Sequence, residues 1–213
     1  MGGCCDPRGC DRMFDHRFAE RMATRYRTKG LDKTASRMVE LLAGRGVQGA
    51  TVLEIGGGVG DIQIELLRRG AASATNLELS PGYEAEAARL LDEAGLTGRV
   101  DRRLADIATD PAAAGPADIV ILHRVVCCYP DYRMLLVAAA ERARSQLVFS
   151  FPPRNTASRA FVAIQNRLLG WGGRQFRAFT HPPTAMLAVL SDHGMHGTVA
   201  HRGPVWQVAY ATR

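Results

Sequence analysis

The sequence lacks long hydrophobic runs, although hydrophobic residues make up 46% of its 213 residues. No apolar stretch approaches the roughly 20 residues of a membrane-spanning helix, so we expect no membrane span. The N-terminal residues 1–10 contain no apolar core of a secretory signal, and Asp6 stands where a myristoylation signal carries Ser or Thr. These absences predict a cytoplasmic protein.

Cysteine is scarce, and its number, five, is odd. In a cytoplasmic chain this argues against disulfides. Cys4, Cys5 and Cys10 cluster near the N-terminus, but their spacing is not one that zinc sites use, and no His or Cys pair nearby completes four ligands. We therefore expect a tail with free thiols, and a metal site at these cysteines is the less favoured alternative.

The net charge of +6 is concentrated near the N-terminus, and aromatic residues make up only 7% of the chain. Basic side chains recur there at spacings of about four, which places them on helix faces. Aromatic residues are not interleaved with them, as a nucleic-acid platform would require. We interpret the charge as a solvated helix face and expect no nucleic acid; a surface for an anionic partner is the alternative. The residues are Arg8, Arg12, Arg17, Arg21, Arg25, Arg27, Lys29 and Lys33.

The rest of the chain alternates between strand and helix patterns, without internal repeats or low-complexity linkers. Such alternation predicts an α/β fold with a doubly wound, mostly parallel sheet of seven strands and an antiparallel C-terminal strand. We divide the chain into an N-terminal segment with basic lid helices, 1–46, and a main domain, 47–213. The expected strands are 51–55, 74–78, 99–104, 117–122, 145–151, 198–201 and 205–212; the expected helices are 12–28, 32–44, 61–69, 82–94, 131–143, 156–169 and 182–193.

A glycine-rich turn follows the first expected strand. After Glu54, glycines occur at alternate positions, at Gly56, Gly58 and Gly60, and a helix pattern begins next. A strand, a glycine turn and a helix start form the usual binding place of nucleotide-like cofactors in open α/β sheets. The dinucleotide fingerprint fails, because Asp61 or Gln63 takes its third glycine position.

Two further acids follow the next two expected strands. Glu78 lies 18 residues after Gly60 and closes the second strand, where a carboxylate can accept hydrogen bonds from both ribose hydroxyls. Asp106 follows the third strand, with Ile107 beside it. Three acids at successive strand ends favour one cofactor site along this edge of the sheet.

The spacing E-x-G-x-G-x-G, together with these acids, resembles class I S-adenosylmethionine (SAM) methyltransferases. The resemblance implies that Glu54 contacts the methionine part of SAM, that Asp106 bonds the adenine amino group, and that Ile107 packs on the ring. The full set of expected cofactor residues is Glu54, Gly56, Gly57, Gly58, Gly60, Glu78, Leu79, Asp106, Ile107 and His123.

Three segments resemble the magnesium-protoporphyrin O-methyltransferase family more closely. They are Tyr26-Arg-Thr-Lys-Gly-Leu-Asp32, residues 118–132 and residues 146–155, within a resemblance that covers residues 20–160. One departure concerns the acceptor, because Cys128 stands where the family has its functional histidine. A neutral thiol cannot accept a proton as imidazole does near neutral pH. This departure argues against carrying the family's porphyrin substrate over directly. We expect a small-molecule acceptor of O-, N- or S-methylation, with a porphyrin-like compound or another carboxylate among the candidates.

Several side chains are candidates for work on the acceptor. For catalysis they are Tyr26, His123 and Cys128, with His123 either a base or a residue that packs on the cofactor. We favour positioning over base catalysis, because no acid is obviously placed to orient the imidazole. Candidate acceptor contacts are Tyr26, Cys128, Tyr129 and Arg154, and weaker candidates are His181 and Trp206.

Two other functions compete with a methyltransferase. An oxidoreductase is disfavoured by the missing third glycine and by the absence of a Tyr-x-x-x-Lys motif. A catalytically silent SAM-binding sensor or interaction protein stays open, because cofactor binding is readable from these motifs and turnover is not. The sequence does not indicate an oligomeric state.

Overall fold

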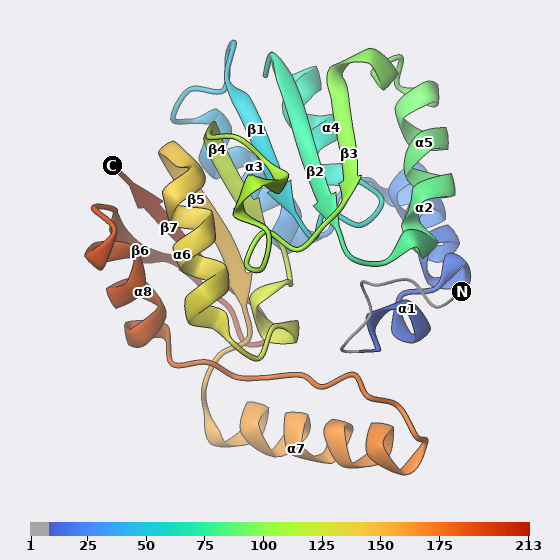
Figure 1. The fold of residues 1–213 in the computed structure, drawn as a ribbon, viewed down its shortest axis with the longest axis vertical. Coiled ribbons are helices and arrows are strands. Elements are labelled where there is room, and N and C mark those ends of the chain that lie inside the picture. The colour runs from blue at the N-terminus through green and yellow to red at the C-terminus, as the bar shows by residue number, and fades with distance from the viewer. Residues whose placement is uncertain (1–8) are drawn as a thin grey trace.

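A computed structural model describes residues 9–213 and contains one seven-stranded sheet (Figure 1). The strand order is β3-β2-β1-β4-β5-β7-β6, with neighbours parallel except at β7, which runs antiparallel to both β5 and β6. The predicted fold class is confirmed. The strands are β1 Thr51–Ile55, β2 Ser73–Glu78, β3 Val100–Leu104, β4 Ala117–Leu122, β5 Ala143–Phe151, β6 His196–Arg202 and β7 Gln207–Thr212.

The helices follow the expected order, with one break that the sequence pattern did not predict. The expected helix over 12–28 is interrupted at Asp15, whose carboxylate accepts a hydrogen bond from the Phe18 N–H (2.9 Å) and so begins a new helix. The helices are α1 Cys10–Met13, α2 His16–Lys29, α3 Lys33–Ala43, α4 Asp61–Arg68, α5 Glu84–Glu93, α6 Tyr132–Arg142, α7 Thr156–Trp171 and α8 Pro183–Asp192; short 3₁₀ turns are η1 Pro81–Tyr83, η2 Thr97–Arg99, η3 Pro111–Ala113 and η4 Val126–Cys128.

Two hydrophobic layers cover the two faces of the sheet. Along β1, Val52 packs into the layer that includes α3 and α4, while Leu53 packs into the layer that includes α6 and α8. Alternate side chains of a strand point to opposite faces, and both faces of a parallel sheet are buried. This explains why the central strands read as continuous apolar runs.

The chain order of the strands places a crevice at one edge of the sheet. From β1 the chain moves outward to β2 and β3, then returns to pair β4 with the other side of β1. Ligands of open α/β sheets bind at such a switch point, beyond the carboxyl ends of the strands. The glycine turn that follows Ile55 lies there.

Helix α7 stands apart from the sheet layers. It follows β5 and extends to Trp171, so it includes Gly170, which the sequence pattern placed in a flexible break. Figure 1 shows it beyond the edge of the sheet that the carboxyl strand ends form. Within residues 9–213, none of the helices has the length and apolar character needed to cross a bilayer.

Candidate functional site

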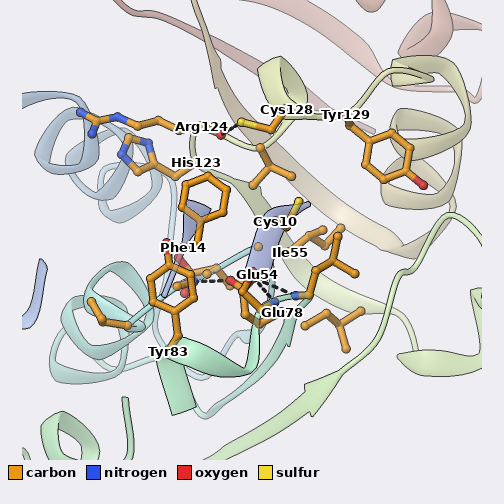
Figure 2. Close-up of a pocket in the computed structure, with 18 of the residues that line it drawn as sticks. Cys10, Phe14, Glu54, Ile55, Glu78, Tyr83, His123, Arg124, Cys128 and Tyr129 are labelled. Carbon is orange, nitrogen blue, oxygen red and sulfur yellow. Dashed lines mark hydrogen bonds between the residues drawn. The ribbon is translucent and has the colours of Figure 1, made fainter. Parts of the chain in front are cut away.

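A cavity of about 180 Å³ lies at the carboxyl ends of β1, β2, β3 and β4. Figure 2 shows Glu54 and Glu78 on one side of it, and His123, Arg124 and Cys128 on the other. Phe14, which caps the end of α1, and Phe18 of α2 contribute to its wall, as a lid would. The structure brings most of the predicted residues together here: Glu54, Gly56, Gly57, Gly58, Glu78, Leu79, Asp106, Ile107, His123, Cys128 and Tyr129 line the cavity.

The glycine turn has room only for glycine. Gly58 has a φ of +53°, in the left-handed region, and its N–H donates to Glu78 Oε2 (2.8 Å). A Cβ at Gly57 would lie 2.8 Å from the Glu54 carboxyl carbon, and one at Gly56 would lie 2.5 Å from Val125 Cγ2. Gly60 (φ +81°) is the N-cap of α4 and does not line the cavity. The turn therefore opens the backbone toward the cavity, as a cofactor site requires.

Glu54 is a buried acid whose charge has no full partner in the protein. It is 1% exposed, and among residues 9–213 no donor reaches its Oε2. Burial, and then the nearby Asp61 carboxylate, raise the pKa of Glu54 well above its usual value. A cationic group in the cavity would relieve this cost, and the amino group of SAM has that charge. This orphaned oxygen fits the predicted cofactor.

Glu78 is held by backbone donors from two sides. Besides the Gly58 N–H, the N–H groups of Leu79 (2.7 Å) and Ser80 (3.1 Å) donate to its Oε1. Burial raises the pKa of Glu78 despite these bonds. A carboxylate offers about four acceptor positions, so Glu78 has room for one further donor. The buried Ser80 hydroxyl lines the cavity beside it and has no partner within the described chain, a contact that sequence reasoning missed.

Asp106 is paired with Tyr129 in this structure. The Tyr129 hydroxyl donates to Asp106 Oδ2 (2.9 Å), and the Ala108 N–H donates to Asp106 Oδ1 (3.1 Å). Tyr129 was predicted as an acceptor contact, but this bond places it at the end of the cavity where the adenine acid lies. Ile107 is buried beside them and is suited to pack on a flat ring.

His123 is held at both ring nitrogens. Its Nδ1 lies 3.0 Å from Ser150 Oγ, and its Nε2 lies 3.4 Å from Asp32 Oδ2. The expectation that no acid orients this imidazole is wrong, because Asp32 does so from 91 residues away. The two bonds nevertheless leave neither nitrogen free to accept a proton from an acceptor, which supports a positioning role.

Arg124 is the strained residue of the site, and sequence reasoning missed it. It has a φ of +59°, the only non-glycine residue with a positive φ among residues 9–213. Its N–H donates to Ser150 Oγ (2.8 Å), a guanidinium nitrogen lies 2.6 Å from Asp32 Oδ2, and the group covers the Trp206 ring at 5.0 Å. Strained backbone is kept at functional sites when surrounding contacts hold it. Arg124 lines the cavity, and its Nε is buried with no hydrogen-bond partner in the described part of the chain.

Two adjacent cysteines follow Arg124, and one lines the cavity. Cys127 Sγ and Cys128 Sγ are 3.6 Å apart. The bond to Cys127, together with burial, raises the pKa of the Cys128 thiol, which therefore stays neutral at physiological pH. Cys10 also lines the cavity, from α1. Cys4 and Cys5 lie outside the described residues, so the N-terminal metal site stays an untested alternative.

Other predicted residues lie away from the cavity. The Tyr26 hydroxyl donates to Glu65 (2.6 Å), and burial raises its pKa, so it ties α2 to α4 instead of facing the site. Arg154 is exposed after β5 and is not part of the lining. His181 Nε2 lies 2.9 Å from the Tyr129 carbonyl oxygen, outside the cavity. Trp206 reaches the site only through Arg124.

Comparison with known proteins agrees with this geometry. Residues 52–146, from β1 through β4 to the first half of β5, match a family described as a methyltransferase domain. This match covers slightly less than half of the chain. The predictions of a SAM-dependent class I methyltransferase and of SAM as its cofactor are confirmed. No curated protein matches the sequence.

Solved methyltransferase structures share the fold of this methyltransferase. It is similar to magnesium protoporphyrin IX methyltransferase from Synechocystis PCC 6803 with bound SAH, with 20% identity, a TM-score of 0.74, and coverage of 96% of this chain and 98% of that one. It is also similar to an O-methyltransferase family protein from Burkholderia thailandensis, with 20% identity, a TM-score of 0.69, and coverage of 94% and 61%. A third similar structure is human N-acetylserotonin methyltransferase in complex with SAM, with 17% identity, a TM-score of 0.64, and coverage of 93% and 55%. At these identities the likeness concerns the fold and not the acceptor.

Proposed function

We propose that this methyltransferase transfers the methyl group of SAM to a carboxylate on a small, largely apolar acceptor. The observation that carries the proposal is Arg124, the only arginine or lysine among the described residues that line the cavity. The wall on the α1 and α2 side consists of Phe14, Phe18 and Met22, with Tyr83 from η1.

The cofactor end of the cavity follows from the acids of the strand ends. SAM supplies, when bound, a methyl group already activated on a sulfonium sulfur. Glu54 would hold its cationic amino group, the free position of Glu78 would accept from a ribose hydroxyl, and Asp106 with Ile107 would hold the adenine. The glycine turn provides the space between these acids.

The acceptor end is built around Arg124. A guanidinium donates two parallel hydrogen bonds to a carboxylate, which fixes the orientation of an acceptor as well as its charge. Asp32 pairs with one guanidinium nitrogen of Arg124 and holds the group in place, and the other terminal nitrogen would donate to the acceptor. Phe14 and Tyr83, with ring centroids 6.2 Å apart, offer an apolar surface for the rest of the acceptor.

A carboxylate acceptor also agrees with the hydrogen bonds that engage both ring nitrogens of His123. A carboxylate is already ionised near neutral pH, so its oxygen can attack without losing a proton. The bonded imidazole of His123 and the neutral thiol of Cys128 would then position the acceptor and exclude water. Catalysis would come mainly from proximity and orientation.

The test is incubation of the purified protein with SAM labelled in its methyl group and a panel of apolar carboxylic acids, porphyrins included. A matched panel carries the same compounds as amides. We expect label to enter only the acids, as methyl esters that release methanol in mild alkali. Label that resists alkali would overturn the carboxylate acceptor. SAM binding without any turnover across both panels would instead support the silent SAM-binding alternative.

A further inference from the structure

Helix α7 carries an exposed apolar stripe. Phe161, Ile164, Leu168 and Trp171 are 68%, 61%, 58% and 73% exposed, and no residue of α7 is fully buried. Their spacings of three, four and three residues place them on one face of the helix. Large apolar side chains exposed singly are normal, whereas a contiguous group marks an interaction surface. Among residues 9–213, the stripe holds four of the seven large apolar side chains that are most exposed.

The opposite face of α7 anchors the helix to the protein. The Asn166 side chain donates to the Ala178 carbonyl (2.8 Å) and accepts from the Ala178 N–H (2.8 Å). These bonds attach α7 to the segment that follows it, residues 172–182. The apolar stripe therefore points outward, away from the body of the protein, as the isolated position of α7 in Figure 1 indicates.

The charge around the stripe has one sign. Residues 154–177 contain no Asp or Glu and five arginines, at positions 154, 159, 167, 174 and 177. Arg167 lies over the ring of Trp171, at 5.1 Å, at the border of the stripe. An apolar face with Trp, Phe and Leu beside arginines is the composition of helices that lie in the interface of anionic membranes.

We infer that α7 docks this methyltransferase on an anionic lipid surface. The stripe enters the boundary between headgroups and acyl chains, and the arginines contact the lipid phosphates. A second copy of the chain fits this face less well, because pairing two stripes would bring the arginines of both copies together without an acid. Nucleic acid fits less well because it would leave the apolar stripe in water.

Docking through α7 would hold the cavity beside the lipid. The segment after α7 is bonded next to the cavity wall, because the Phe179 N–H donates to the carbonyl of Cys127 (2.7 Å), the neighbour of the lining residue Cys128. Phe176 packs on Phe14 of the wall, with ring centroids 5.4 Å apart. An apolar acceptor dissolved in the membrane would thus reach the site over a short path.

The experiment measures binding of the full chain to vesicles of phosphatidylcholine alone and of phosphatidylcholine mixed with phosphatidylglycerol. Trp206→Phe leaves Trp171 as the single tryptophan and reporter. We expect cosedimentation and a blue shift of Trp171 fluorescence with the anionic vesicles only, weakened by salt. Phe161→Ser combined with Leu168→Ser should lower the partition coefficient at least tenfold. Arg167→Gln should lower it about fivefold, the effect of one basic residue near an anionic surface.

Val205→Ser is the matched control, because Val205 is 66% exposed in the turn between β6 and β7 and should leave binding unchanged. Failure to bind anionic vesicles would overturn the proposal. So would equal binding to both vesicle types, a stripe-dependent dimer in sedimentation equilibrium, or stripe-dependent binding of RNA. The assay contains neither SAM nor acceptor, so its outcome is independent of the proposed methyl transfer.

Discussion

The Asp32 carboxylate joins the start of α3 to the imidazole of His123. Its Oδ1 accepts from the N–H groups of Thr34 (2.7 Å) and Ala35 (3.0 Å), and its Oδ2 faces His123 Nε2 (3.4 Å) and the Arg124 guanidinium (2.6 Å). The Asp32 side chain thus caps α3 and orients two residues of the cavity, His123 and Arg124. Through Asp32 the start of α3 becomes part of the site.

The first prediction concerns the charge of Asp32. Burial acts to raise its pKa, but the hydrogen bond and charge of His123, with the Ala35 N–H and Arg124, hold it well below the usual value. A depressed pKa stabilises the fold above the ordinary carboxyl range and loses that contribution as the pH falls toward the folded-state value. Asp32→Asn should lower the free energy of unfolding at pH 7 by about 3 kcal/mol, the cost of breaking a buried pair.

Urea unfolding at several pH values checks this. The difference in free energy of unfolding between wild type and Asp32→Asn should narrow steadily below about pH 4, where the carboxylate of the unfolded chain becomes protonated. Asp15→Asn is the comparison: Asp15 caps α2 through the Phe18 N–H and makes no side-chain hydrogen bond to His or Arg, so its loss at pH 7 should be smaller. A difference in unfolding free energy that stays constant down to low pH would contradict the claim that the Asp32 charge causes the stabilisation.

The second prediction concerns Glu54 and the cofactor. Because burial raises its pKa, part of Glu54 is protonated in the free protein as the pH falls, and binding of a cationic amino group must displace that proton. SAM affinity should therefore weaken toward acid pH. Glu54→Gln should raise Kd at neutral pH by roughly 10- to 100-fold, in line with a charged hydrogen bond of 1.5–3 kcal/mol.

Calorimetry across pH gives the readout, with two buffers of different ionisation enthalpy to count released protons. The Gln variant should show no pH dependence below neutral. Its free form should also unfold at a higher temperature above neutral pH, because the raised pKa of Glu54 costs stability once the carboxyl is ionised. Equal SAM affinity of both proteins would remove Glu54 from the cofactor site.

The third prediction separates backbone strain from cofactor space in the glycine turn. Gly58→Val should abolish SAM binding, because its branched side chain would enter the space above the turn, where Tyr83 is already 3.3 Å from a Cβ. Gly95→Val is the matched control. Gly95 has a similar φ of +66° but nothing within 4 Å, so this variant should lose about 1–2 kcal/mol of stability and keep SAM binding. Equal loss of binding in both would mean that strain alone is responsible.

The fourth prediction distinguishes the two arginines proposed for the acceptor. Arg124→Gln should raise the acceptor KM at least tenfold, with a smaller change in kcat, because a charged contact is lost. Arg154→Gln should leave both unchanged, since Arg154 is exposed outside the cavity. Steady-state kinetics at saturating SAM measure both variants. A larger effect of Arg154→Gln than of Arg124→Gln would support Arg154, the arginine predicted from the sequence, as the acceptor contact.

The fifth prediction concerns His123. Since both ring nitrogens are bonded, His123→Ala should lower turnover at saturating substrates by less than tenfold and act mainly on SAM and acceptor affinity. A general base would cost 10²–10⁴-fold. The measurement is turnover against pH. Disappearance of an acidic limb near pH 6–7 together with a large loss would show that the imidazole moves a proton.

The sequence predicted the fold well where the physical signal is local. The bounds of β1 and β4 agree with their apolar runs, and the glycine spacing predicted the turn between Glu54 and α4. The break at Asp15 was missed because a capping Asp within a basic helical pattern also fits a solvated face. Only the hydrogen bond from the Phe18 N–H shows that Asp15 caps a helix and is not a solvated residue within one.

The acceptor half of the site depends on contacts that local patterns do not encode. Asp32 and His123 are distant in sequence and meet only when α3 docks on the sheet. The positive φ of Arg124 has no sequence signal, because arginine rarely takes that conformation. Tyr26 looked functional by resemblance, yet its partner Glu65 on α4 makes it a structural contact.

Tyr129 contacts both the cofactor cavity and the segment that follows α7. Its hydroxyl bonds Asp106 at the adenine end of the cavity, and its carbonyl oxygen receives His181 from the segment that follows α7. Thermodynamic linkage requires reciprocity between such sites. Whatever factor an event at α7 imposes on cofactor affinity, cofactor binding must impose the same factor on that event.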